Sequence, residues 1–268
     1  MTPSAVADGL GCDGWSVPAL SALRVPSGPP GEDGCVVRVT PASAAWTYVG
    51  FEVYRLAGRL DRREEDRETC VVLLSGACSL MGLGEAARAT VFDGPPTALY
   101  VPPRLPWWVE GEGEIAVCTA PAEGALEPRL LDSAELVTRG SGSEERYIAN
   151  ILMESEAAES LLVTEVVTPA GHWSSYPPHK HDRDDPPHET LLEETYYHRL
   201  RGGSGFAIQR VYTDDGTLDE AVAVSDGDVV LVPRGYHPVA GDPRVDLYYL
   251  NVMAGPVREW RVAVAPGY

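Results

Sequence analysis

The sequence consists of short runs of β-branched and aromatic residues, each ended by glycine, proline or aspartate. The runs lie at residues 36–39, 51–56, 70–74, 98–101 and 115–118 in the first half, and at 161–167, 194–199, 206–212, 229–232 and 247–253 in the second. Helical periodicity is scarce, and the 23 prolines and 27 glycines supply residues suited to turns. Short strands bounded by turn residues are typical of sandwiches and barrels. The sequence therefore predicts an all-β fold.

The two halves of the chain share a weak internal repeat. The string RETCVVLLSG at residues 67–76 parallels EETYYHRLRG at 193–202, and ALYVPP at 98–103 parallels VVLVPR at 229–234. A repeated order of strands predicts two copies of one β domain. We place them at residues 1–136 and 137–268, with a linker around residues 131–142. In this alignment Glu68 occupies the place of Glu194.

The histidines all fall in the second half: His172, His179, His181, His188, His198 and His237. Residues i and i+2 of a strand face the same side, so His179 and His181 can present two imidazoles to one point. Glu194 begins an extended run, and His237 follows a run that ends in Val-Pro. Imidazole and carboxylate groups together suit one divalent ion per chain, which we expect to be Zn, Mn, Fe, Co or Ni.

The order His-x-His, Glu, distant His resembles the signature of the cupins. This resemblance implies a bicupin, with two tandem double-stranded β-helix (jelly-roll) domains. The first half contains no histidine, so its domain should lack metal ligands. The loop between His181 and Glu194 is longer than in the common cupin motif, and it contains Glu189 as an alternative carboxylate ligand. We prefer Glu194, because it precedes a Tyr-Tyr strand and because Glu68 matches it in the repeat.

The second half also resembles the 5-deoxy-glucuronate isomerases of myo-inositol catabolism, which are related to the 4-deoxy-uronate ketol-isomerases. The strings that carry the resemblance are WSSYPPHKHD at 173–182, PHET at 187–190, EETYYHR at 193–199, QRVYTDD at 209–215, DGDVVLVPRGYHP at 226–238 and YYLNVMAG at 248–255. The resemblance implies a metal-dependent aldose-ketose isomerase that converts 5-deoxy-glucuronate to 5-dehydro-2-deoxy-gluconate. It also implies a ligand set of His179, His181, Glu194 and His237.

Strand alternation suggests the remaining site residues. If Glu194 points inward, Tyr196 and His198 do so too, and the ordinary pKa of histidine makes His198 a candidate general base. A buried core histidine is the alternative interpretation of His198. For the substrate carboxylate we expect Arg210 as the main contact. Lys180 is a weaker candidate, because alternation turns it away from the metal, and Tyr196 would line the same pocket.

The charge of the chain limits its partners. The formal net charge of −19 argues against binding to nucleic acid and requires a local basic group for an anionic sugar acid. No apolar stretch approaches the length of a membrane span, and residues 1–10 lack a basic start followed by an apolar run. We therefore expect a cytoplasmic protein without a membrane partner. By analogy with other cupins, we expect a homo-oligomer.

Two other functions fit the same pattern. A metal-dependent cupin dioxygenase could use three histidines and a glutamate, and a non-catalytic bicupin could bind a sugar without turnover. An isomerase assay without oxygen separates the first from an isomerase.

Overall fold

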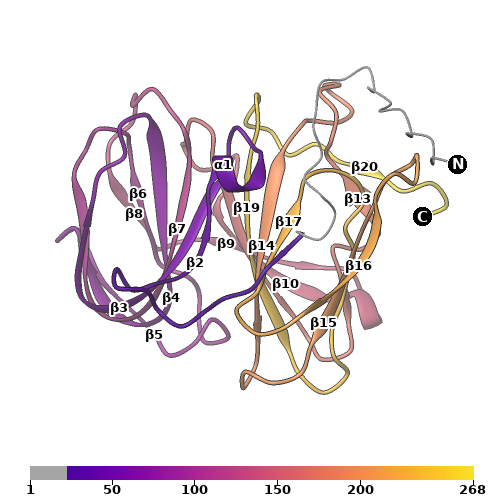
Figure 1. The fold of residues 1–268 in the computed structure, drawn as a ribbon, viewed down its shortest axis with the longest axis horizontal. Helices are drawn as coiled ribbons and strands as arrows, with labels where there is room; N and C mark the ends of the chain where they lie inside the picture. Colours follow the sequence, from indigo (N-terminus) through magenta and orange to yellow (C-terminus); the bar gives the residue numbers. More distant parts are fainter. Residues whose placement is uncertain (1–22) are drawn as a thin grey trace, which may run out of the picture.

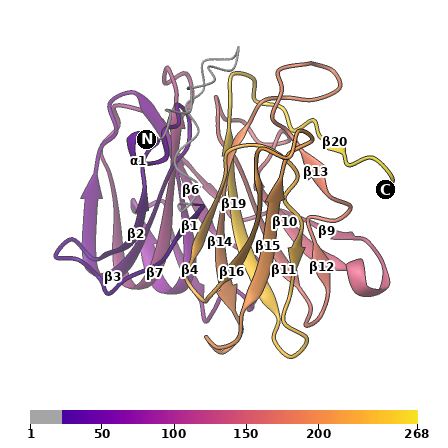
Figure 2. The same ribbon diagram turned by 45° about the vertical axis from the view of Figure 1, so that its right-hand side comes forward.

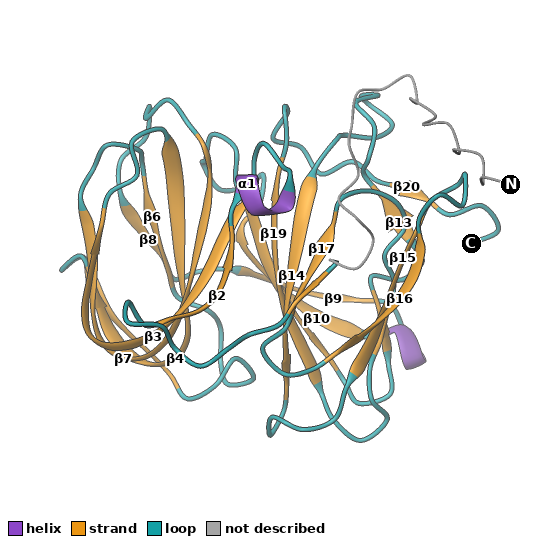
Figure 3. Cartoon of the chain, viewed as in Figure 1, coloured by secondary structure: helices purple, strands orange, loops and turns teal. Residues whose placement is uncertain are grey.

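The computed structural model describes residues 23–268, so residues 1–10, which bear on targeting, lie outside the described part. Strands make up nearly all of the regular structure (Figure 3). The exceptions are one turn of helix, α1 (Pro41–Ala44), and a short 3-10 turn, η2 (Gly142–Glu144). The all-β prediction is confirmed. Within residues 23–268, no helix has the length and apolar character needed to span a bilayer.

The first large sheet contains strands β2 to β8 of the first half, in the order β2-β3-β7-β4-β6-β8, with β5 paired to β4. Their bounds are β2 (Cys35–Val39), β3 (Gly50–Arg62), β4 (Arg67–Leu80), β5 (Gly84–Arg88), β6 (Ala98–Val101), β7 (Trp107–Pro121) and β8 (Arg129–Leu131). The first half of β4 is buried on both faces: Val71 and Leu73 belong to one core cluster, while Val72 and Leu74 belong to another. Burial on both faces explains why this strand is a continuous apolar run.

The second half, together with β1, forms a second seven-stranded sheet that faces a four-stranded one, with a two-stranded pair beside them. The seven-stranded order is β1-β17-β14-β19-β11-β10-β9, the four-stranded order is β12-β18-β15-β16, and β13 pairs with β20. The bounds are β1 (Arg24–Val25), β9 (Glu135–Arg139), β10 (Arg146–Leu152), β11 (Leu162–Thr168), β12 (Trp173–Ser174), β13 (His179–Lys180), β14 (Glu193–Leu200), β15 (Ala207–Tyr212), β16 (Asp219–Val224), β17 (Val229–Val232), β18 (Val239–Ala240), β19 (Leu247–Ala254) and β20 (Ala263–Val264).

The sheet that contains β14 and β19 lies between the sheet of the first half and the four-stranded sheet (Figures 1 and 2). Its two faces therefore have different roles. On β14, Tyr197 packs against first-half residues, with its ring centroid 5.7 Å from that of Phe51. The neighbouring Tyr196 faces the interior of the second half. Apart from β1, strands that end at or before Leu131 belong to the first large sheet, and strands that start at or after Glu135 belong to the sheets of the second half. The division into domains at 136/137 stays a prediction.

Two buried glutamates join the halves in a reciprocal way. Glu68 of β4 accepts hydrogen bonds from the backbone N–H groups of residues 159–161, just before β11. Glu193 of β14 accepts the N–H groups of residues 47–49, just before β3. Each carboxylate thus satisfies three backbone donors at the start of a strand in the other half, where unsatisfied buried donors would be unfavourable.

These contacts correct the alignment of the repeat by one residue. Glu194 pairs with Val232, the valine of the second Val-Pro, whereas the valine of the first Val-Pro pairs with Thr69. Glu68 is therefore the structural counterpart of Glu193, and the expectation that it matches Glu194 was wrong. A shift of one residue moves a strand side chain to the opposite face of its sheet, so the repeat gives no support to Glu194 as a ligand.

Candidate metal centre and its pocket

Three buried side chains converge inside the second half: His181, Glu194 and His237. His181 directly follows β13, Glu194 lies in β14, and His237 lies in the turn after β17. Nε2 of His181 is 2.9 Å from Oε2 of Glu194, and Nε2 of His237 is 3.2 Å from the same oxygen. The candidate ligand atoms all lie within 4.8 Å of one another, so these residues could hold a metal ion.

Backbone carbonyls fix the orientation of both rings. Nδ1 of His181 lies 3.1 Å from the carbonyl oxygen of Leu192, and Nδ1 of His237 lies 2.8 Å from that of Gly235. A carbonyl oxygen can only accept, so each Nδ1 must carry the proton and donate it. The Nε2 of each ring then points toward Glu194, as in metal-binding histidines whose other nitrogen is hydrogen-bonded. Burial opposes the charged form of His181, but the hydrogen bond to Glu194 raises its pKa overall, so the Nε2 of His181 also carries a proton here, and a bound cation would take the place of that proton.

The environment of Nε2 of His237 indicates that a cation would fit between the two histidines and Glu194. This Nε2 is buried without a hydrogen-bond partner, although Glu194 is close. Burial, followed by the charges of His179 and His181, holds the pKa of His237 well below its usual value, so the ring is neutral. Asn251 donates to Oε1 of Glu194 at 2.7 Å, which leaves Oε2 facing both histidines. A buried lone pair beside a carboxylate needs an explanation, and a divalent cation supplies one.

His179 lies next to this group but not within it. Its ring centroid is 4.9 Å from that of His237 and 6.5 Å from that of His181. Its Nδ1 is 3.2 Å from the carbonyl oxygen of Pro177, so Nδ1 donates to that oxygen and Nε2 of the neutral ring is unprotonated. Burial, with the nearby charge of His181 and two arginines, lowers the pKa of His179 to about 4. The structure thus assembles three of the four predicted ligands and places the fourth beside them.

The loop before β14 is held by the buried Lys180. Its ammonium nitrogen is 3.0 Å from Asp182, 3.1 Å from Asp214 and 3.8 Å from Glu189. Glu189 also accepts the backbone N–H of Asp182, and it takes no part in the histidine group. The geometry favours Glu194 over Glu189 as the carboxylate ligand. Lys180 faces away from the candidate ligands, as alternation predicted.

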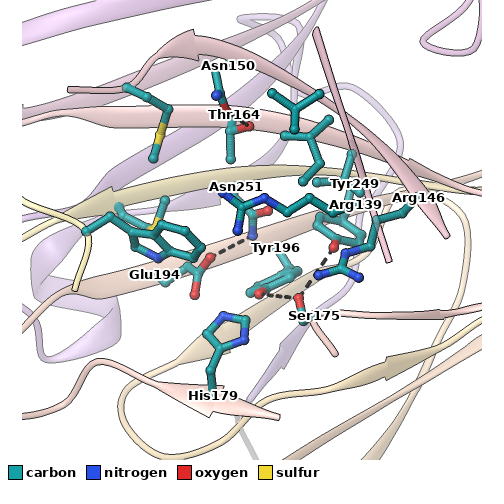
Figure 4. A pocket seen from close by; sticks show the side chains of 16 residues that line it. Arg139, Arg146, Asn150, Thr164, Ser175, His179, Glu194, Tyr196, Tyr249 and Asn251 are labelled. Carbon is teal, nitrogen blue, oxygen red and sulfur yellow. Dashed lines mark hydrogen bonds between the residues drawn. The ribbon is translucent and has the colours of Figure 1, made fainter. Parts of the chain in front are cut away.

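A pocket opens above the metal centre (Figure 4). Its empty space is about 580 Å³, a figure that includes open solvent at its mouth. It is lined by Val137, Arg139, Arg146, Ile148, Asn150, Met153, Thr164, Val166, Ser175, His179, Glu194, Tyr196, Tyr249, Asn251, Met253 and Trp260.

Hydroxyl groups form a chain along one wall of the pocket (Figure 4). The Tyr196 hydroxyl is 2.9 Å from Oγ of Ser175, which is 3.4 Å from the Tyr249 hydroxyl. The Tyr249 hydroxyl is also 2.6 Å from Oγ of Ser174. Burial raises the pKa of both tyrosines, so both phenols stay protonated and can donate. Tyr196 faces the pocket, as strand alternation predicted.

His198 lies deeper in the core than the pocket. It is fully buried, its ring stacks on that of Tyr196, and its Nε2 is 3.0 Å from Oε1 of Gln209. Burial lowers its pKa to about 4. His198 does not line the pocket, so its position favours the alternative interpretation, a core histidine, over direct contact with substrate.

The buried His198 should make stability fall in mild acid. Its pKa is about 4 when folded and about 6.5 when unfolded, so the unfolded chain binds more protons as the pH falls below 6.5. From these values, protonation of His198 lowers the free energy of unfolding by about 2 kcal/mol between pH 7 and pH 5. Urea unfolding of His198→Asn should therefore show a smaller loss over this interval than wild type. His188→Asn, at an exposed position, serves as control; equal losses in all three proteins would contradict the assignment.

The two arginines that line the pocket were not among the site residues predicted from the sequence. Arg210, the expected contact for the carboxylate, is half exposed on β15 and pairs with Asp219 at 2.7 Å, away from the pocket lining. The lining arginines are instead Arg139 on β9 and Arg146 on β10. Arg139 was assigned to a linker. The β-branched runs on either side of Gly-Ser-Gly at 140–142 are a hairpin signal that could have identified this pair.

Comparisons with known proteins agree with the geometry. The sequence profile of the KduI/IolB family matches residues 23–268. The chain is 53% identical over 254 residues to the 5-deoxy-glucuronate isomerase of Geobacillus kaustophilus (strain HTA426), covering 90% of this chain and 92% of that protein. It is 41% identical over 246 residues to the protein of the same name from Bacillus subtilis (strain 168), covering 87% and 91%.

Solved structures agree on the fold. An IolB-like protein from Salmonella typhimurium LT2 superposes with a TM-score of 0.85 and 42% identity, covering 91% of this chain and 96% of that one. Bacillus subtilis oxalate decarboxylase, a cupin-fold protein, gives a TM-score of 0.63 at 13% identity, covering 92% and 80%. The second likeness concerns the fold alone, and it supports the predicted bicupin architecture.

Proposed function

This chain belongs to the KduI/IolB family, and from that premise we propose that it is an aldose-ketose isomerase that converts 5-deoxy-glucuronate to 5-dehydro-2-deoxy-gluconate. The names of its relatives support the substrate. The observation that carries the chemistry is the buried group of His181, Glu194 and His237, of which Glu194 lines a pocket.

We further propose that these three residues hold one divalent metal ion and that His179 is the fourth ligand. Their nitrogen and oxygen donors suit Zn, Mn, Fe, Co or Ni. A bound ion would supply a Lewis acid for the sugar carbonyl. Asn251 fixes the carboxylate of Glu194 through its hydrogen bond to Oε1, and the carbonyls of Leu192 and Gly235 fix the two imidazoles.

The hydroxyl chain is suited to handle protons at the sugar oxygens. Isomerisation moves a hydrogen from C2 to C1 of the sugar and exchanges which of the two oxygens is a carbonyl. The protonated phenols of Tyr196 and Tyr249 can donate hydrogen bonds to these oxygens, and Ser175 connects them. Tyr196 is thus proposed as a substrate contact. His198 supports the Tyr196 ring from behind.

Removal of metal should abolish activity reversibly. We expect protein treated with a chelator to lose isomerase activity with 5-deoxy-glucuronate under nitrogen, and to recover it when about one equivalent of a divalent metal returns. Elemental analysis before and after treatment measures the metal content. Turnover by fully metal-free protein would exclude the metal's role. Turnover that requires oxygen would indicate a dioxygenase, and binding of the sugar acid without turnover would indicate a binding protein.

Two expectations from the sequence remain proposals. We propose that the chain acts in the cytoplasm and that it assembles as a homo-oligomer.

A further inference from the structure

The two arginines that line the pocket are direct neighbours across a hairpin. Arg139 is the last residue of β9 and Arg146 the first of β10, and their Cα atoms are paired in the antiparallel register. Figure 4 shows both side chains extending into the pocket that also contains Glu194, Tyr196 and Asn251. Two guanidinium groups therefore face the space above the candidate metal centre.

Neither arginine has a carboxylate partner among residues 23–268. Arg146 donates to the carbonyl oxygen of Glu144 at 3.0 Å, and the guanidinium carbon of Arg139 lies 5.5 Å from the ring centroid of Trp260. Many other arginines of this acidic chain do pair with carboxylates, as Arg210 does with Asp219 and Arg88 with Glu165. Like charges directly opposite each other are unfavourable for a hairpin, so the pair is not explained by stability of the fold.

An anion bound between the arginines would resolve this repulsion. A carboxylate can accept parallel hydrogen bonds from a guanidinium group, and a local basic pair is needed where the net charge of −19 repels anions. The carboxylate of a uronate is at the opposite end of its six-carbon chain from the reacting carbonyl. The pocket has two matching ends: the arginines could bind the carboxylate, and the candidate metal centre could bind the carbonyl.

We infer that Arg139 and Arg146 form the subsite for the substrate carboxylate and make the enzyme select uronates over neutral aldoses. This inference rests on the proposed function for the identity of the substrate. It assigns specificity to a hairpin that contributes no metal ligand, so chemistry and selectivity can be separated by mutation.

The test compares two substrates in matched variants. Arg139→Gln, Arg146→Gln and the double variant are assayed with 5-deoxy-glucuronate and with its neutral analogue, in which CH2OH replaces the carboxylate. Each single change should lower kcat/KM for the uronate by about 10- to 100-fold, the range expected for loss of a charged hydrogen-bond partner, and leave the neutral analogue nearly unchanged. Arg210→Gln, which changes an arginine outside the pocket, is the matched control and should behave as wild type.

A binding measurement separates the inference from the proposed reaction. D-glucuronate and D-glucose are added to metal-free protein, and the shift in Tm is recorded. Glucuronate should raise the Tm of wild type and of Arg210→Gln but not of the double variant, and glucose should have little effect on any of them. Because Arg139 is exposed, Arg139→Gln is expected to fold even if the double variant does not.

The outcomes discriminate between the two ideas. If wild type fails to isomerise 5-deoxy-glucuronate while glucuronate binding still depends on both arginines, the proposed function fails and the carboxylate subsite stands. If both single variants keep the preference for the uronate, the subsite is overturned and the isomerase assignment is untouched. An equal loss with the acid and the neutral analogue would also overturn the inference, because it would show that the arginines support only the structure.

Discussion

Replacement of Glu194 by glutamine should empty the metal centre and lower kcat/KM by about three orders of magnitude. Glutamine keeps the shape of the side chain and can still bond to Asn251, but it lacks the negative charge that faces His181 and His237. A catalytic metal supplies several kcal/mol of stabilisation to the transition state, and each 1.36 kcal/mol is tenfold in rate. The metal content per chain, measured by elemental analysis, should fall in parallel with activity.

Glu189→Gln is the control for this change. Glu189 is a buried glutamate in the loop between His181 and Glu194. It accepts a hydrogen bond from the backbone N–H of Asp182 and lies outside the histidine group. We expect this variant to keep about one metal per chain and to lose less than about tenfold in kcat/KM. The substitution changes a side chain that holds the loop and does not remove a proposed metal ligand. Metal loss in Glu189→Gln with retention in Glu194→Gln would show that the wrong carboxylate was assigned.

Local periodicity was sufficient to predict the all-β class, whereas the candidate metal ligands were predicted from the resemblance of the order His-x-His, Glu, distant His to the cupin signature. His181 and His237 stand out because histidine is confined to the second half, and Glu194 stands out because it begins a run of strand-forming residues. The inward direction of Tyr196 followed from strand alternation, which depends only on positions within one strand. The direction of a side chain could therefore be predicted without knowing which strands lie beside its own.

Properties that depend on pairing between strands were not predicted from the sequence. The repeat was aligned one residue out, because similarity of short strings does not define which residues are opposite each other in a ladder. Arg139 was missed for a related reason: only its pairing with Arg146 carries the edge strand β9 to the pocket. Arg210 was expected to contact the carboxylate, but its position on one strand could not show that it would pair with Asp219, two residues from Ala221, which lies opposite it on β16.

The junction between the halves provides the second large effect, on stability: Arg88→Met should lower the free energy of unfolding by about 3–5 kcal/mol. Arg88 of β5 forms two hydrogen bonds to Glu165 of β11, at 2.7 and 2.9 Å, and both side chains are buried. Arg88 also donates to the carbonyls of Val91 and Gly94, and Tyr248 donates to Glu165 at 3.0 Å. The methionine side chain fills similar space but leaves a carboxylate without its counter-charge in the interior.

The double variant Arg88→Met, Glu165→Met distinguishes the ion pair from simple packing at this junction. Removal of both charges takes away the unpaired buried carboxylate, so the double variant should recover a large part of the stability lost in Arg88→Met. Urea unfolding at pH 7 of wild type, Arg88→Met, Glu165→Met and the double variant gives four free energies of unfolding, and the difference between the double change and the sum of the two single changes gives the coupling between the two residues. If the double variant is as unstable as the sum of the two single changes, the pair contributes no coupling. The joint between the halves would then depend on the apolar contacts around Phe51 and Tyr197 and on the two reciprocal glutamates.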